Sequence, residues 1–155
     1  MTPPLNSPAP DFMLQDQFGT VHSLAEYAGR YILLYFYPKD DTEGCTVEAC
    51  GFRDRLNELK EKNVQVLGVS ADDTESHKKF AEKYDLNFPL LSDPEKKVIE
   101  AYGVWKEKEM FGKTNMGIVR ESFLIGLDGT ILKHYADVKP ANHPEEVLED
   151  ISKKT

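Results

Sequence analysis

An uninterrupted apolar run over residues 31–37, Tyr-Ile-Leu-Leu-Tyr-Phe-Tyr, constrains the fold of this chain most strongly. A short run rich in aromatic and branched side chains predicts a strand that is buried on both faces of a sheet. Apolar residues at helical spacing follow it, at Cys45, Ala49, Phe52, Leu56 and Leu59, and a second branched strand, Val64–Ser70, comes next. A strand, a helix and a strand in this order predict parallel pairing of the two strands.

The remaining segments predict further strands and helices. Residues 1–10 hold four prolines, which predict an extended start. We then expect a hairpin over residues 11–24. Two helices should follow, one that Thr74 caps and that runs to Tyr84, and a short one from Asp93-Pro94 to about Gly103. A hairpin of 122–125 and 130–135 around Asp128-Gly129 and a last helix from His143-Pro144 complete the order. This order predicts one α/β domain over residues 1–155 with a thioredoxin-like fold, in which helices flank both faces of a central mixed sheet and an N-terminal β-hairpin precedes it.

Both cysteines of the chain lie at the start of the first predicted helix, with Cys45 in the first turn and Cys50 five residues later. The unpaired N–H groups and the dipole at a helix N-terminus lower a cysteine pKa from about 8.5 to roughly 3.5–7.5. Since the thiolate is the nucleophilic form, this position predicts cysteine chemistry. A structural zinc site takes four ligands, so we expect neither a metal nor a cofactor. The histidines form no ligand-spaced cluster, and we interpret them as surface residues (His22, His77, His134 and His143).

The overall charge and hydropathy exclude several classes of protein. Nineteen Lys and Arg against 27 Asp and Glu give a net charge of −8, which disfavours a nucleic-acid partner because phosphate binding needs clustered cations. The chain has no apolar run of membrane length, and its first residues have neither a basic region nor an apolar core. We therefore expect no membrane span and no secretory signal. Only two cysteines and no secretory signal predict a reducing compartment, the cytoplasm.

The residues around the cysteines resemble a known family. Pro38, Thr42 and Cys45 form the pattern Pro-x-x-x-Thr-x-x-Cys, which is similar to the active-site signature of peroxiredoxins. With Cys50 and the distant segment 119–125, Val-Arg-Glu-Ser-Phe-Leu-Ile, the chain resembles the bacterioferritin comigratory protein branch, also called peroxiredoxin Q. The resemblance extends over nearly the whole chain.

Two positions depart from the pattern of this branch. Glu43 stands where proline is usual, and Gly126 stands where an acidic residue is common. Glu43 adds a negative charge two residues before Cys45, which opposes ionisation of the thiol. Neither departure removes a reacting group, so the assignment holds.

The resemblance implies a thiol-dependent peroxidase that reduces hydrogen peroxide and organic hydroperoxides. Cys45 would attack the peroxide, and Arg120 would stabilise the thiolate and orient the substrate. Thr42 would exchange hydrogen bonds with the thiol or the peroxide, and Pro38 would shield the sulfur from bulk water. Two further residues are expected to contact the substrate or line its pocket, Gly44 and Trp105.

The attack leaves a sulfenic acid on Cys45, which condenses with a thiol. Cys50 is the only candidate within the chain, although the resolving cysteine can also lie on another molecule. Five helical residues place the two Cα atoms roughly 8–9 Å apart, whereas a disulfide needs less than about 7 Å. We therefore expect the first turns of the helix to unwind as the disulfide forms. The resemblance implies a monomer whose disulfide is reduced by thioredoxin, or less readily by glutaredoxin.

Two other functions stay open on the residues alone. A thiol–disulfide oxidoreductase needs Cys-x-x-Cys at a helix start, but Thr42 occupies the first of these positions before Cys45. A redox sensor would form a stable complex with a partner on oxidation and would turn over slowly.

Overall fold

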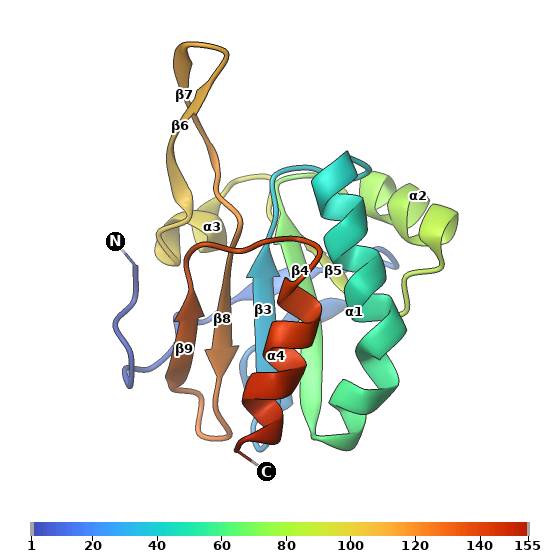
Figure 1. The fold of residues 1–155 in the computed structure, drawn as a ribbon, viewed down its shortest axis with the longest axis vertical. Coiled ribbons are helices and arrows are strands. Elements are labelled where there is room, and N and C mark those ends of the chain that lie inside the picture. The colour runs from blue at the N-terminus through green and yellow to red at the C-terminus, as the bar shows by residue number, and fades with distance from the viewer. Residues whose placement is uncertain (1, 155) are drawn as a thin grey trace.

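A seven-stranded mixed sheet in the order β2-β1-β5-β4-β3-β8-β9 forms the centre of the protein (Figure 1). The computed structural model describes residues 2–154. The predicted strand–helix–strand unit is present, because β3 (Tyr31–Phe36) pairs in parallel with β4 (Val64–Ser70) and α1 (Glu43–Glu61) connects them. A second crossover through α2 (Thr74–Tyr84) leads to β5 (Leu90–Ser92), which pairs in parallel with β4.

Antiparallel strands complete both sides of the sheet. The predicted N-terminal hairpin consists of β1 (Met13–Gln15) and β2 (Val21–Ser23), and β1 continues the sheet beside β5. On the other side, β8 (Glu121–Ile125) pairs with β3, and β9 (Ile131–Tyr135) pairs with β8. The turn between β8 and β9 holds Gly129 at a φ of 84°, a conformation that favours glycine. The sequence therefore predicted the mixed character of the sheet correctly.

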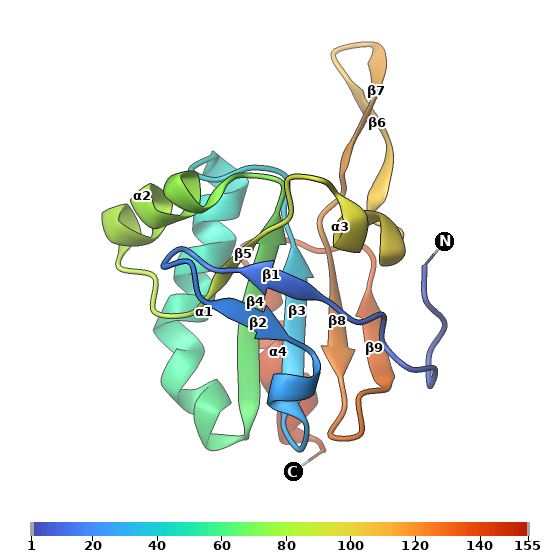
Figure 2. The ribbon, with the colours of Figure 1, turned by 180° about the vertical axis from the view of Figure 1, so that it is seen from behind.

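Helices cover both faces of the sheet (Figures 1 and 2). On one face, α1, α2 and α4 (His143–Ser152) pack over Leu33 and Tyr35 of β3. On the other face, the short α3 (Lys97–Ala101) lies over the alternate residues of the same strand, Ile32, Leu34 and Phe36. A single turn of 3-10 helix, η1 (Ala25–Tyr27), packs on this second face. None of the helices in residues 2–154 is long and apolar enough to cross a membrane.

A second sheet of two strands, β6 (Trp105–Met110) and β7 (Lys113–Ile118), projects from the body at the end where α1 begins (Figure 1). The sequence analysis assigned no element to this segment. Charged residues dominate β6 and most of β7 is exposed, so the hairpin lacks the apolar alternation that marks a half-buried strand. Its turn at Phe111 and Gly112 has φ values of 54° and 77°, the left-handed geometry of a tight hairpin.

The short helix α3 begins later than predicted. It starts at Lys97 rather than at Asp93-Pro94, because Lys96 adopts a left-handed φ of 62° and its N donates to the carbonyl of Asp93 in a turn. The side chain of Asp93 still serves the helix, since its Oδ2 accepts from the N of Ile99 at 2.8 Å. The helix ends at Ala101, close to the predicted stop.

Asp73, and not Thr74 as predicted, caps the N-terminus of α2. The Asp73 side chain accepts a hydrogen bond from the N of Ser76 at 2.8 Å. This is the bond that a capping side chain makes to the third residue of a helix. Aspartate and threonine are both good N-cap residues, so the two adjacent candidates could not be separated by residue type alone.

The interpretation of the histidines as surface residues was wrong. His22, His77 and His143 are buried, and His134 is half-buried. A buried ring needs hydrogen-bond partners because unpaired polar groups are costly away from water. Both ring nitrogens have partners in each of the three buried cases, which are Asp16 and Tyr27 for His22, Asp40 and Leu91 for His77, and Ser122 and Glu146 for His143.

His77 ties the loop between β3 and α1 to α2 and β5. Its Nδ1 lies 2.6 Å from Asp40 Oδ2 and its Nε2 lies 3.0 Å from the carbonyl oxygen of Leu91. The Tyr37 hydroxyl donates to the other oxygen of Asp40 at 2.6 Å. Ligand-type atoms of Asp40, Asp72 and His77 lie within 4.8 Å of one another, but the Asp40 and His77 atoms already pair with each other. The loop that leads to Cys45 is therefore anchored at its start.

Replacing His77 with alanine should destabilise the fold, because it removes two buried hydrogen bonds, to Asp40 Oδ2 and to the Leu91 carbonyl oxygen. We expect the free energy of unfolding in urea to fall by roughly 3 kcal/mol. Lys79→Ala, at an exposed position of the same helix, should change it by less than about 0.5 kcal/mol. Equal effects of the two substitutions would contradict the anchoring role of His77.

Candidate active site

Cys45 is the third residue of α1 and is only 1% exposed. The first backbone bond of the helix runs from the N of Thr46 to the O of Thr42 at 2.8 Å. The N–H groups of the preceding turn have no partner inside the helix and point toward the space before it. The predicted place of the cysteine, in the first turn of a helix after a buried strand, is therefore correct.

Arg120 reaches the sulfur from the link between β7 and β8. Its Nη2 donates to Cys45 Sγ at 3.5 Å, and its Nη1 donates to Glu48 Oε1 at 2.9 Å. The guanidinium is always charged and planar, so it can contact both groups at once. The sequence analysis placed Arg120 at the site only by resemblance, and the structure brings the two residues into contact.

Gly44 makes room for this guanidinium. A Cβ atom at Gly44 would lie 3.0 Å from Arg120 Nη2 and 3.6 Å from Pro140 Cγ. A side chain there would push Arg120 away from the start of α1. The sequence analysis expected Gly44 to contact the substrate, and in the structure it lies against the arginine.

Glu48 belongs to the site, and the sequence analysis did not single it out. Its side chain is 0% exposed, and among the described residues only its Oε1 has a hydrogen-bond partner, while its Oε2 has none. Burial raises the pKa of Glu48 to about 7, although the charge of Arg120 acts in the opposite direction. An ionisable residue three positions after Cys45, on the apolar face of the helix, was the signal that could have revealed it.

The floor beneath these residues is apolar. Tyr35 lies under α1 and stacks on Phe52 with ring centroids 4.9 Å apart. Burial, and then the nearby Glu48 and Cys45, raise the pKa of Tyr35 well above its ordinary value. Since charges interact more strongly where water is excluded, this floor strengthens the effect of Arg120 on the sulfur.

Thr42 and Pro38 lie in the approach to α1. Thr42 is the exposed N-cap residue, and its hydroxyl donates to the carbonyl oxygen of Lys39 at 2.9 Å. The lone pairs of this hydroxyl stay able to accept a hydrogen bond from a ligand. Pro38 is half-buried and lies two residues after the end of β3.

Cys50 and Trp105 lie farther from the arginine contact. Cys50 is half-buried on the same uninterrupted helix as Cys45, and both cysteines are free thiols. Trp105 lies at the base of the β6–β7 hairpin, where Lys96 Nζ is 5.1 Å from its ring centroid. Its packing partners belong to the core on the opposite face of the sheet from Cys45.

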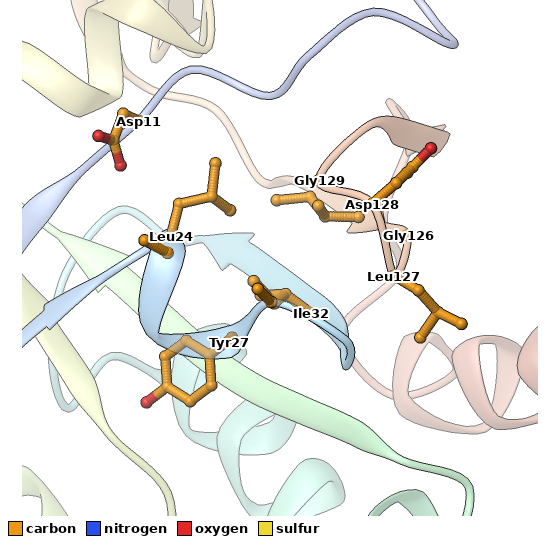
Figure 3. A pocket seen from close by; sticks show the side chains of 11 residues that line it. Asp11, Leu24, Tyr27, Ile32, Gly126, Leu127, Asp128 and Gly129 are labelled. Atoms are coloured by element: carbon orange, nitrogen blue, oxygen red, sulfur yellow. The ribbon is translucent and has the colours of Figure 1, made fainter.

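A pocket of about 420 Å³ lies at the other end of the sheet (Figure 3). Ile32, at the start of β3, contributes to its wall, whereas Cys45 follows the far end of that strand. The pocket is therefore separate from the cysteine site. Its other labelled residues include Asp11, with Leu24 and Tyr27 at η1 and Leu127 in the β8–β9 turn.

A guanidinium that donates a hydrogen bond to a buried sulfur favours the thiolate, and it can also stabilise an oxygen anion that forms beside the sulfur. At the end of a buried strand in a mixed sheet of this order, such a site is that of a thiol-dependent peroxidase. The model of the AhpC/TSA family matches residues 5–134, and the chain belongs to this family.

Relatives and solved structures agree with this assignment. Peroxiredoxin Bcp of Bacillus subtilis is 46% identical over 157 residues, which cover 99% of this chain and 100% of that protein. Peroxiredoxin Bcp of Escherichia coli is 51% identical over 140 residues, 90% of each chain. A peroxiredoxin Q structure from Xylella fastidiosa superposes with a TM-score of 0.92 at 34% identity and covers 97% of this chain and 96% of that one. The fold is thioredoxin-like, and the chain is a thiol-dependent peroxidase of the Bcp and peroxiredoxin Q type.

The raised pKa of Glu48 makes stability depend on pH. The folded protein keeps a proton on Glu48 up to about pH 7, whereas the unfolded chain releases it near the ordinary value of 4.5. The free energy of unfolding should therefore fall as pH rises through this interval. Glu48→Gln should remove a fall of up to about 3 kcal/mol, measured by urea unfolding of the reduced protein at several pH values. Glu58→Gln, at an exposed position of α1, should keep it, and an equally steep fall in Glu48→Gln would refute the buried titration.

Proposed function

We propose that Cys45 is the residue that attacks the peroxide and that Arg120 is its electrostatic partner. The Cys45 thiolate forms a bond to one peroxide oxygen as the O–O bond breaks, which gives a sulfenic acid. The second oxygen leaves with the electron pair and takes up a proton as water or an alcohol. The 3.5 Å contact between Arg120 Nη2 and Cys45 Sγ carries this proposal, because the same charge favours the thiolate and the oxygen anion that leaves.

The surrounding residues hold this arrangement ready. Glu48 fixes one arm of the Arg120 guanidinium, and Gly44 leaves the other arm free to lie against the start of α1. The Thr42 hydroxyl accepts a hydrogen bond from the peroxide, since its own O–H donates to the carbonyl oxygen of Lys39. Pro38 lacks an N–H and shields the approach from water. Trp105 stays a candidate for the outer rim.

Cys50 resolves the sulfenic acid in this proposal. Its sulfur bonds to Cys45 Sγ, and the hydroxyl of the sulfenic acid leaves as water with the proton of the Cys50 thiol. Both residues lie on one continuous helix, so the first two turns of α1 must open. Opening stops at Gly51, because α4 holds the helix from there, and a Cβ at Gly51 would lie 2.7 Å from Pro144 Cγ.

Hydrogen peroxide and small organic hydroperoxides are the proposed substrates. A structure of the Xanthomonas campestris bacterioferritin comigratory protein was described for its alkyl peroxide reduction activity, and it superposes with a TM-score of 0.87 at 37% identity. It covers 92% of this chain and 91% of that one. Thioredoxin is the proposed reductant, with glutaredoxin as the alternative, in line with the thioredoxin-type reductants of the family. We also propose that the chain acts as a single-domain monomer in the cytoplasm.

Single-cysteine variants should separate the two roles. Cys45→Ser should lose at least about 10³-fold in peroxide consumption with thioredoxin, because a serine hydroxyl is not ionised near neutral pH. Cys50→Ser should reduce one equivalent of peroxide and then stop at the sulfenic acid. Peroxide consumption in a coupled thioredoxin assay, with stopped-flow fluorescence for the first turnover, measures both. Full thioredoxin-linked cycling by Cys50→Ser would remove Cys50 as the resolving residue.

Oxidation should open a limited part of α1. After one equivalent of peroxide, amide hydrogen exchange should speed up at residues 46–54, whose N–H groups bond to the carbonyls of 42–50, while residues 55–61 keep their protection because they stay packed on the core and α4. Cys50→Ser serves as the control, since it is oxidised at Cys45 but forms no intramolecular bond. Unchanged protection at residues 46–54 in a protein whose mass shows the disulfide would rule out the opening.

A further inference from the structure

One lysine connects the projecting hairpin to the site. Lys108 pairs with Asn115 in the β6–β7 register, but its side chain runs back toward the base of the hairpin. There its Nζ donates to the carbonyl oxygen of Ile118 at 2.8 Å. Ile118 lies two residues before Arg120, so Lys108 binds the backbone that leads into the arginine.

Gly117 opens the path for this side chain. In the register, Gly117 faces Lys106, which is two residues before Lys108 and therefore on the same face of the hairpin. A Cβ atom at Gly117 would lie 2.8 Å from Lys108 Cδ and 3.7 Å from Lys108 Cγ. Only a residue without a side chain lets the lysine lie flat across the strand at this point.

Burial and the charges of the site both affect the ammonium group of Lys108. Burial lowers the pKa of Lys108, the positive charge of Arg120 lowers it further, and Cys45 raises it. The other lysine on this face, Lys106, is paired with Glu121 at 2.8 Å. Lys108 is thus a hairpin cation that is held at the base of the hairpin by Ile118, two residues before Arg120.

We propose that Lys108 is a positioning residue of the peroxidase site. It fixes the backbone before Arg120 and adds a second positive charge that favours the Cys45 thiolate. Near this point the backbone of the link is also held by one bond, from the N of Val119 to the O of Val104 at 2.9 Å. The inference rests on the roles proposed above for Cys45 and Arg120.

The test uses Cys50→Ser as the parent, so that each molecule reacts once with peroxide. In this parent, Lys108→Met should lower the second-order rate constant with hydrogen peroxide about tenfold. It should also raise the pH midpoint of Cys45 alkylation by iodoacetamide by about half a unit. A purely structural defect would not move that midpoint. Lys113→Met, at an exposed position of the same hairpin, makes the same change in net charge and should alter the rate by less than about twofold.

A second variant tests the path of the side chain while the charge is kept. Gly117→Ala should displace the lysine stem and lower the rate in the same direction as Lys108→Met. Combining the two substitutions should cost no more than Lys108→Met alone, because both remove one contact. Additive losses would contradict the proposed geometry.

The Cys50→Ser parent separates a failure of the proposed peroxidase function from a failure of the role of Lys108. A parent that reacts with peroxide no faster than free cysteine overturns the proposed function and this inference with it. A fast parent in which Lys108→Met matches Lys113→Met, in both rate and alkylation midpoint, overturns only the role of Lys108.

Discussion

The site depends on one guanidinium that lies between a sulfur and a buried carboxylate. Arg120 donates to Cys45 Sγ and to Glu48 Oε1, and both of these groups come from the first two turns of α1. The pairing of β8 with β3 brings Arg120 to the start of α1. Because β8 pairs with β3 in a register that sets Glu121 opposite Phe36, the residue before β8 lies at the end of β3 where α1 begins. Two segments 75 residues apart therefore meet at one point.

The same region joins fixed and movable parts. The loop after β3 is held by the buried pair of Asp40 and His77, and the later turns of α1 are held by α4 and the core. Between them, the turn that carries both Cys45 and Glu48 is tied to the rest of the site through Arg120. A change in the charge of the sulfur therefore acts directly on the contact between Arg120 and this turn.

Regular apolar periodicity explains which parts of the fold could be predicted. Val64–Ser70 has the bounds expected from the sequence, and α2 ends at Tyr84 as expected, because one is a branched run and the other an amphipathic helix. The β6–β7 hairpin lacks such a pattern, since it packs little of its surface. Glu48, His77 and His143 were missed because at least one partner of each is distant in sequence, and a buried polar residue is recognised by its partners. The position of Arg120 beside the sulfur came from family resemblance alone.

The contact between Gly51 and Pro144 has a consequence for the durability of the protein. In the proposed cycle, this close packing stops the opening of α1 at Gly51, so that Phe52 and the aromatic residues beneath it stay covered. Aggregation begins from exposed apolar surface. In the proposed cycle, each round of oxidation and reduction therefore uncovers only the small side chains of Cys45 and Ala49 from this core, and its large aromatic residues stay covered.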